Sequence, residues 1–156
     1  MMTELANASV LVTGGGSGIG AATAAYLAER GARVTISGRR EDKIRAVAES
    51  IGPACLAVPG DVTVAQDREH MVAGAVDHGG GLDALVNNAG NMYRGPLPSL
   101  TEQGLQDIFN SNVISAMLLS GLCVEHLAKR NGAIVFLGSI HNRRAFPGVS
   151  PYAATK

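Results

Sequence analysis

Five short apolar runs, separated by segments with helical periodicity, constrain the fold of this chain more than any other feature. Continuous rather than alternating apolar runs are typical of strands buried on both faces of a parallel sheet. The expected strands are Ser9–Thr13, Arg33–Ser37, Ala54–Val58, Leu82–Val86 and Ala133–Gly138. The expected helices are Ile19–Arg30, Glu41–Ile51, Val64–His78 and a long helical region from about Thr101 to Lys129.

This alternation predicts an α/β fold with a doubly wound, Rossmann-type parallel sheet and the strand order 3-2-1-4-5 for the part that is visible. The 156 residues suffice for one domain with a hydrophobic core but are few for two, so we expect a single nucleotide-binding domain over residues 1–156. In such sheets the ligand binds at the carboxyl ends of the strands. The candidate functional residues below all follow expected strands or lie on the helices beside them.

Composition narrows the choice of partners. Thirteen basic residues balance thirteen acidic ones, which argues against binding to nucleic acid or to an anionic membrane. Cys55 and Cys123 lie far apart in apolar segments, so we expect reduced core cysteines and no metal site. The first residues, 1–4, carry no basic leader, and the most apolar stretch, Val113–Val124, is too short to span a bilayer. A cytoplasmic protein is therefore the expectation.

The glycine-rich segment Thr13–Gly20 (TGGGSGIG) joins the first expected strand to the first expected helix. Glycines allow a tight turn and let the backbone approach a pyrophosphate, which then lies at the positive end of the helix. The spacing is TGxxxGIG rather than the general GxGxxG, and an ordinary flexible turn is the alternative. The candidate cofactor contacts are Gly14, Ser17, Gly18, Ile19 and Gly20.

The end of the second strand bears on the choice of cofactor. An acidic residue here would bind the adenosine ribose hydroxyls of NAD. This sequence has Gly38 instead, followed by Arg39 and Arg40, and a guanidinium binds a 2′-phosphate well. NADP(H) is therefore favoured, with Arg39 as the first candidate and Ser37 or Arg40 assisting. NAD(H) remains open, because a glycine does not exclude it and both arginines could be solvated.

Two further motifs follow strands. Asp61-Val62 comes after the third strand, where it could simply precede a helix cap, and Asn88-Ala89-Gly90 comes after the fourth, where it could be a turn. Later, Asn112 lies on the long helix and Ser139 ends the fifth strand. Tyr152 and Lys156 form a Tyr-x-x-x-Lys motif, and on a helix that spacing brings the ammonium near the phenol.

In order and position, these motifs resemble those of the short-chain dehydrogenase/reductase family over the whole chain. The resemblance implies that Asp61 and Val62 lie against the adenine and that Asn88, Ala89 and Gly90 lie near the cofactor. It implies that Tyr152 exchanges a proton with the substrate while Ser139 hydrogen-bonds the substrate oxygen. Lys156 would hold the nicotinamide ribose and favour the phenolate, and Asn112 would anchor a water in the proton relay.

The implied function is hydride transfer between NADP(H), or less favourably NAD(H), and a small carbonyl or alcohol substrate. The alternative is a catalytically inactive nucleotide-binding fragment or regulatory module. Members of the family continue past the Tyr-x-x-x-Lys motif with a helix, two strands and a substrate-binding lid. The resemblance therefore implies a domain incomplete at the C-terminus, with Ala133–Gly138 as an uncovered edge strand, and a homodimer or homotetramer if the chain is complete.

The segment 141–147 should border the substrate. One hypothesis is that Arg143 or Arg144 attracts an anionic group of the substrate, and the alternative is surface charge on a loop. His141 could touch substrate, but nothing in the sequence marks it as a base in addition to Tyr152.

Overall fold

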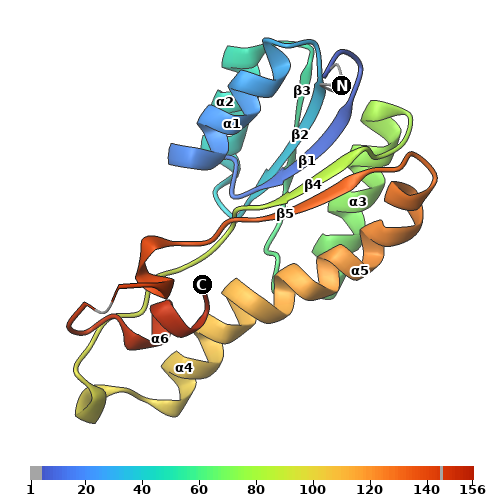
Figure 1. The fold of residues 1–156 in the computed structure, drawn as a ribbon. Helices are drawn as coiled ribbons and strands as arrows, with labels where there is room; N and C mark the ends of the chain where they lie inside the picture. The colour runs from blue at the N-terminus through green and yellow to red at the C-terminus, as the bar shows by residue number, and fades with distance from the viewer. Residues whose placement is uncertain (1–4, 145) are drawn as a thin grey trace.

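The computed structural model describes residues 5–144 and 146–156 and contains a five-stranded parallel sheet of order β3-β2-β1-β4-β5 (Figure 1). The expected fold class and strand order are confirmed. Residues 1–4, on which the expectation of no leader rests, lie outside the described residues, as does Ala145 in the segment 141–147. The strands are β1 Ser9–Thr13, β2 Arg33–Gly38, β3 Cys55–Pro59, β4 Ala84–Asn87 and β5 Ala133–Phe136. The α-helices are α1 Gly18–Ala28, α2 Glu41–Ile51, α3 Ala65–Gly79, α4 Glu102–Phe109, α5 Ser115–Ala128 and α6 Ser150–Ala154.

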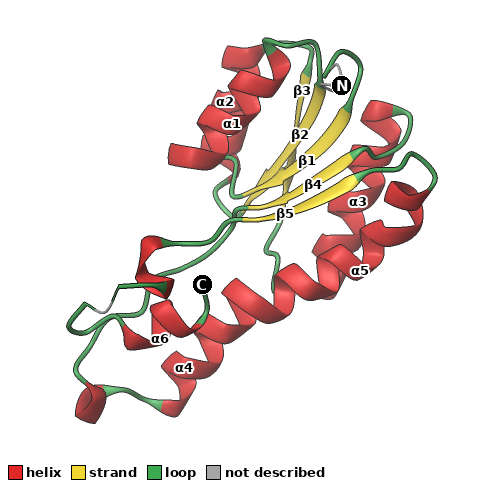
Figure 2. Ribbon diagram, in the orientation of Figure 1, coloured by secondary structure: helices red, strands yellow, loops and turns green. Residues whose placement is uncertain are grey.

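Helices cover both faces of the sheet, with α1 and α2 on one side and α3 and α5 on the other (Figure 2). On β1, Val10 and Val12 contribute to the core beneath α1 and α2, whereas Leu11 contributes to the core beneath α3 and α5. Because successive strand residues point to opposite faces and both faces are buried, every position in the strand needs an apolar or small side chain. This explains the continuous apolar runs.

The expected helix from Thr101 to Lys129 is interrupted. Helices α4 and α5 are joined by a π-helical segment, Asn110–Ile114, and the whole runs from Glu102 to Ala128. A π-turn inserts an extra residue and rotates the side chains that follow it. Asn112 is buried within this segment, whereas Phe109, the last residue of α4, is 38% exposed.

The continuous helical segment Glu102–Ala128 is long and apolar enough to cross a bilayer by length and composition alone. It includes the shorter apolar stretch Val113–Val124 that stands out in the sequence. Leu119, Cys123 and Leu127 of this helix instead pack into the core shared with β1 and β4. A core helix of a globular domain passes the same test, so this observation is weak evidence for a membrane span.

Strand β5 forms one edge of the sheet and pairs only with β4 among the described strands. It ends at Phe136, two residues earlier than expected, and Val135 and Phe136 are 47% and 58% exposed. After β5 the chain turns through a 3₁₀ segment, Ile140–Asn142, to α6, which lies beside α4 below the carboxyl end of the sheet (Figure 1). This return brings the Tyr-x-x-x-Lys motif to the carboxyl end of the sheet (Figure 1).

Candidate functional site

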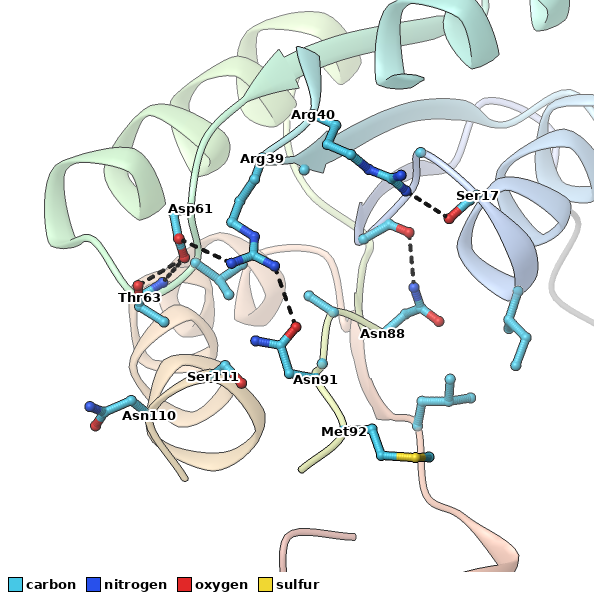
Figure 3. Close-up of a pocket in the computed structure, with 18 of the residues that line it drawn as sticks. Ser17, Arg39, Arg40, Asp61, Thr63, Asn88, Asn91, Met92, Asn110 and Ser111 are labelled. Atoms are coloured by element: carbon cyan, nitrogen blue, oxygen red, sulfur yellow. Dashed lines mark hydrogen bonds and ion pairs between the residues drawn. The ribbon is translucent and has the colours of Figure 1, made fainter. Parts of the chain in front are cut away.

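A cleft with a volume of about 1290 Å³ opens at the carboxyl ends of the strands (Figure 3). Segments that follow each of the five strands line it, together with residues of the C-terminal turn. The predicted site residues that line it are Gly14, Ser17, Ile19, Arg39, Asp61, Val62, Asn88, Ala89, Gly90, Ser139, Tyr152 and Lys156. The other three, Gly18, Gly20 and Asn112, lie beside or behind its wall.

The glycine loop is held close to the start of α1. A Cβ on Gly20 would lie 2.3 Å from the Gly14 carbonyl oxygen and 2.6 Å from Asn88 Nδ2, so only glycine fits at this contact. Gly18 has a φ of +54°, a left-handed conformation that favours glycine, and open space lies where its Cβ would be. Close packing therefore explains Gly20, and backbone conformation explains Gly18.

The N-terminus of α1 points at the cleft without a side-chain cap. Ser17 is the N-cap residue, but its side chain makes no capping hydrogen bond, and the first turn contains no acidic residue. By contrast, the Thr101 hydroxyl caps α4 by accepting a hydrogen bond from the Gly104 amide over 3.1 Å. Uncapped amides and the positive end of the helix dipole form a binding site for an anion such as a pyrophosphate.

A hydrogen-bonded clamp joins the end of β4 to the end of β1. The Thr13 hydroxyl accepts hydrogen bonds from the amides of Asn88 and Ala89 over 3.1 and 3.0 Å. The Asn88 side-chain amide donates to the carbonyl oxygens of Thr13 and Gly14 over 2.8 and 3.2 Å. Asn88 thus holds the glycine loop in place. Sequence reasoning did not single out Thr13, although it opens the TGxxxGIG motif.

The two arginines after β2 point to different partners (Figure 3). Arg39 Nη1 lies 4.0 Å from an Asp61 carboxylate oxygen, and its Nη2 donates to Asn91 Oδ1 over 3.4 Å. Arg40 Nη2 donates to the Ser17 hydroxyl over 3.5 Å. Ser37, expected to assist them, is fully buried and does not line the cleft.

Asn91 is a second residue that sequence reasoning missed. It lies on the loop after β4, lines the cleft, and contacts both Arg39 and Asn112. Its position directly after the Asn-Asn-Ala-Gly motif was the available signal.

Only the first part of the Tyr-x-x-x-Lys motif is helical, whereas the sequence favoured one helix for both Tyr152 and Lys156. Helix α6 begins at Ser150 and ends at Ala154, two residues before Lys156. Lys156 Nζ nevertheless lies 5.9 Å from the centre of the Tyr152 ring, and it donates to the Leu137 carbonyl oxygen over 3.0 Å. The end of β5 therefore anchors the ammonium near the phenol.

Ser139 begins the 3₁₀ turn that follows β5. Its hydroxyl oxygen accepts a hydrogen bond from the His141 amide over 3.2 Å, and its hydroxyl hydrogen has no acceptor among the described residues. Because Ser139 lines the same cleft as Tyr152 and Lys156, that hydrogen is available to a ligand oxygen.

The Asn112 side chain is buried behind the cleft and makes four hydrogen bonds. Its Nδ2 donates to the Asn91 carbonyl and to the Thr155 hydroxyl, each over 2.9 Å. Its Oδ1 accepts from the Asn91 amide over 2.7 Å and from the Ser111 hydroxyl over 2.9 Å. An asparagine side chain offers two donor hydrogens and two acceptor lone pairs, so this one has none left for the expected water.

The segment between Ser139 and Tyr152 contributes little to the cleft wall. Arg143 and Arg144 are exposed and do not line the cleft, which favours surface charge over contact with an anionic substrate. The His141 ring packs edge-to-face against Tyr152, with ring centres 5.7 Å apart, and against Phe146 at 4.6 Å. His141 therefore supports the Tyr152 ring from outside the cleft.

The two cysteines are free and buried in opposite cores, as expected for core residues. Burial raises the pKa of the Cys55 thiol to about 11 and that of the Cys123 thiol to about 12. Both thiols are therefore protonated near neutrality, which disfavours a nucleophilic or ligating role.

Comparison with known proteins places this geometry in context. The family model described as short chain dehydrogenase matches residues 8–156. An uncharacterized oxidoreductase of Listeria monocytogenes is 33% identical over 155 residues, which cover 96% of this chain and 62% of that protein. Dehydrogenase/reductase SDR family member 4 of Bos taurus is 39% identical over 158 residues, covering 97% of this chain and 56% of that protein.

Among solved structures, a 3-ketoacyl-(acyl-carrier-protein) reductase from Brucella melitensis, complexed with NADH, superposes with a TM-score of 0.94. It is 30% identical, and the match covers 97% of this chain and 65% of that one. The chain thus spans less than two thirds of the length of each of these relatives.

Proposed function

Because the chain belongs to the short-chain dehydrogenase family, we propose that it forms the nucleotide-binding part of an oxidoreductase. The reaction is hydride transfer between NADP(H), or less favourably NAD(H), and a carbonyl or alcohol substrate. One observation carries the proposal: Ser139, Tyr152 and Lys156 line the same cleft as the uncapped N-terminus of α1. An anion-binding helix end and a group able to exchange protons therefore share one site.

The residues of the cleft fit a dinucleotide along its length. The backbone amides of the glycine loop would hold the pyrophosphate at the start of α1. The residues concerned are Gly14, Ser17, Gly18 and Ile19. Arg39, Asp61 and Val62 would surround the adenosine half, and Ala89, Gly90 and Lys156 the nicotinamide half. Asn88 and Gly20 serve the site by fixing the glycine loop. The cofactor would supply the hydride.

The chain's own contribution is the movement of one proton. The Tyr152 hydroxyl donates its proton to the carbonyl oxygen in the direction of reduction, while the Ser139 hydroxyl donates a hydrogen bond to the same oxygen. The Lys156 ammonium lies 5.9 Å from the Tyr152 ring centre, where its hydrogen bond to the Leu137 carbonyl oxygen holds it. Asn112 acts as a positioning residue in this proposal, because it holds the turn that carries Lys156.

The preference for NADP(H) over NAD(H) is part of the proposal. The position at the end of β2 where an acidic residue would bind the ribose of NAD is Gly38, and Arg39 and Arg40 follow at the cleft wall. The Arg39 side chain is 64% exposed, so the contact with Asp61 is weak and can be exchanged for a phosphate.

Location and assembly complete the proposal. We place the protein in the cytoplasm, because Cys55 and Cys123 are free thiols rather than a disulfide, and we propose that it forms a homodimer or homotetramer. Exposed apolar side chains on α5 support self-association: Met117 is 65%, Leu118 50% and Leu122 41% exposed.

A nucleotide-binding module without catalysis remains the second candidate, but it would have no use for Ser139, Tyr152 and Lys156 in one cleft.

The test is carbonyl-dependent loss of NADPH absorbance by the purified protein and by Tyr152→Phe. The variant removes only the hydroxyl, so we expect it to lose activity while it still binds NADPH. Tyr26→Phe is the matched control, because Tyr26 lies exposed on α1 and contacts Arg30 rather than the cleft. Activity of Tyr152→Phe equal to that of the control would refute the assigned proton donor.

A further inference from the structure

The first turn of α3 contains a buried arginine. Arg68 is only 7% exposed, and no carboxylate in the described part of the chain lies within ion-pair distance of it. Burial of a guanidinium without an opposite charge costs free energy, and its Nε also lacks a hydrogen-bond partner. The contacts that Arg68 does make therefore need an explanation.

Arg68 and its neighbour Asp67 hold the backbone of the loop that follows β3. Arg68 Nη1 donates to the Val62 carbonyl oxygen over 2.7 Å. Asp67 Oδ2 accepts a hydrogen bond from the Asp61 amide, also over 2.7 Å. Two consecutive residues of α3 thus fix the Asp61–Val62 pair from both ends, and each bond involves an ionised side chain, which makes it stronger than a neutral one.

The same loop lies directly on α3 and forms part of the cleft wall. A Cβ on Gly60 would lie 2.8 Å from Met71 Cε and 3.0 Å from Asp67 Cβ, so the loop backbone has no clearance above the helix. Gly60, Asp61 and Val62 all line the cleft, whereas Asp67 and Arg68 do not. The two helix residues can therefore affect a ligand only through the loop that they hold.

We propose that Arg68 and Asp67 are positioning residues for the adenosine half of the cofactor. They fix the Asp61 and Val62 backbone at the place where that half lies in the proposed function, on which this inference rests. The guanidinium of Arg68 binds the Val62 carbonyl oxygen rather than a carboxylate. This role explains why a buried arginine has no opposite charge beside it and why its Nε has no hydrogen-bond partner. Their removal weakens adenosine recognition and leaves the nicotinamide half of the site unchanged.

The experiment compares two half-ligands on the purified protein. Adenosine 2′,5′-bisphosphate reports on the adenosine half, and reduced nicotinamide mononucleotide reports on the nicotinamide half; both dissociation constants are measured by titration. For Arg68→Met we expect about tenfold weaker binding of the adenosine ligand, from the loss of one charge-assisted hydrogen bond, and unchanged binding of the mononucleotide. Arg68→Lys, which keeps a charge and a donor, should recover part of the loss.

Asp67→Ala provides a second route if Arg68→Met does not fold, because it releases the other end of the same pair and should show the same selective loss. Arg45→Met is the matched control, since Arg45 is exposed on α2 and pairs with Glu41 away from the cleft. Equal losses for both half-ligands, or no loss for either, would overturn the inference while the proposed function stands. If the wild-type protein bound neither half-ligand, the proposed function and this inference would fall together.

Discussion

Asn112 Nδ2 donates a hydrogen bond to the Thr155 hydroxyl over 2.9 Å, which joins the π-helical segment between α4 and α5 to the turn that separates Tyr152 from Lys156. Thr155 passes the constraint on, because its hydroxyl donates to the Tyr152 carbonyl oxygen over 2.8 Å. A residue that the family resemblance assigns to a proton relay thus instead holds the backbone that carries Tyr152 and Lys156.

Thr155→Val should therefore lower kcat without a large change in the affinity for NADPH. Valine has the shape of threonine but cannot accept the Asn112 hydrogen bond, so the turn that carries Lys156 loosens. Small misplacements of reacting groups reduce rates by up to about 100-fold, and we expect a loss of roughly tenfold here. Steady-state kinetics check it, with Thr155→Ser as the variant that keeps the hydroxyl and the rate; equal rates for serine and valine would contradict the role.

Gly20→Ala should destabilise the fold and weaken nucleotide binding. The added Cβ would meet the Gly14 carbonyl oxygen at 2.3 Å, and overpacking of this kind costs about 1–3 kcal/mol. Gly121→Ala is the control, because Gly121 lies exposed on α5 with no atom within 4 Å of the added Cβ, where alanine should stabilise by up to about 1 kcal/mol. Urea unfolding measures both free energies, and a Gly20→Ala value equal to that of the wild type would contradict the packing account.

Arg39→Ala should weaken NADPH more than NADH. Loss of a charge-assisted contact to the 2′-phosphate is worth about 1.5–3 kcal/mol, or roughly 10- to 100-fold in the dissociation constant for NADPH. NADH carries no such phosphate, so its dissociation constant should change little. Titration with both cofactors decides the matter, and parallel losses would assign Arg39 a general rather than a selective role.

The two cysteines should react slowly in the folded protein. A raised pKa means that the thiol stays protonated to higher pH, and burial places the pKa of Cys55 at about 11 and that of Cys123 at about 12. The thiolate is the reactive form, so at pH 8 a chromogenic disulfide reagent should label neither residue until denaturant is added. Rapid labelling of the native protein at pH 8 would show that one of the two cores opens readily.

The sequence predicted the sheet well because the signal for buried parallel strands is local and redundant. All five strands lie within two residues of their expected bounds, and the order follows from the regular alternation with helices. The glycine loop was also readable, since the left-handed conformation of Gly18 and the close contact at Gly20 both demand glycine.

The remainder depends on contacts that periodicity does not encode. The π-turn at Asn110–Ile114 resembles an ordinary helix in sequence, so the four hydrogen bonds of the Asn112 side chain could not be foreseen. Arg68 gave a signal that was missed: it lies three and four residues before Met71 and Val72 and so shares their buried face. A charged residue on an apolar helical stripe indicates a specific partner, here the Val62 carbonyl.

We expect the cleft at the uncapped start of α1 to bind a dinucleotide. The most direct measurement is an equilibrium titration of the purified protein with NADPH and with NADH, followed by the fluorescence of the reduced nicotinamide. We predict saturable binding of one NADPH per chain, with a smaller dissociation constant than that of NADH. Absence of saturable binding for either cofactor, in protein whose circular dichroism shows a folded α/β domain, would contradict it.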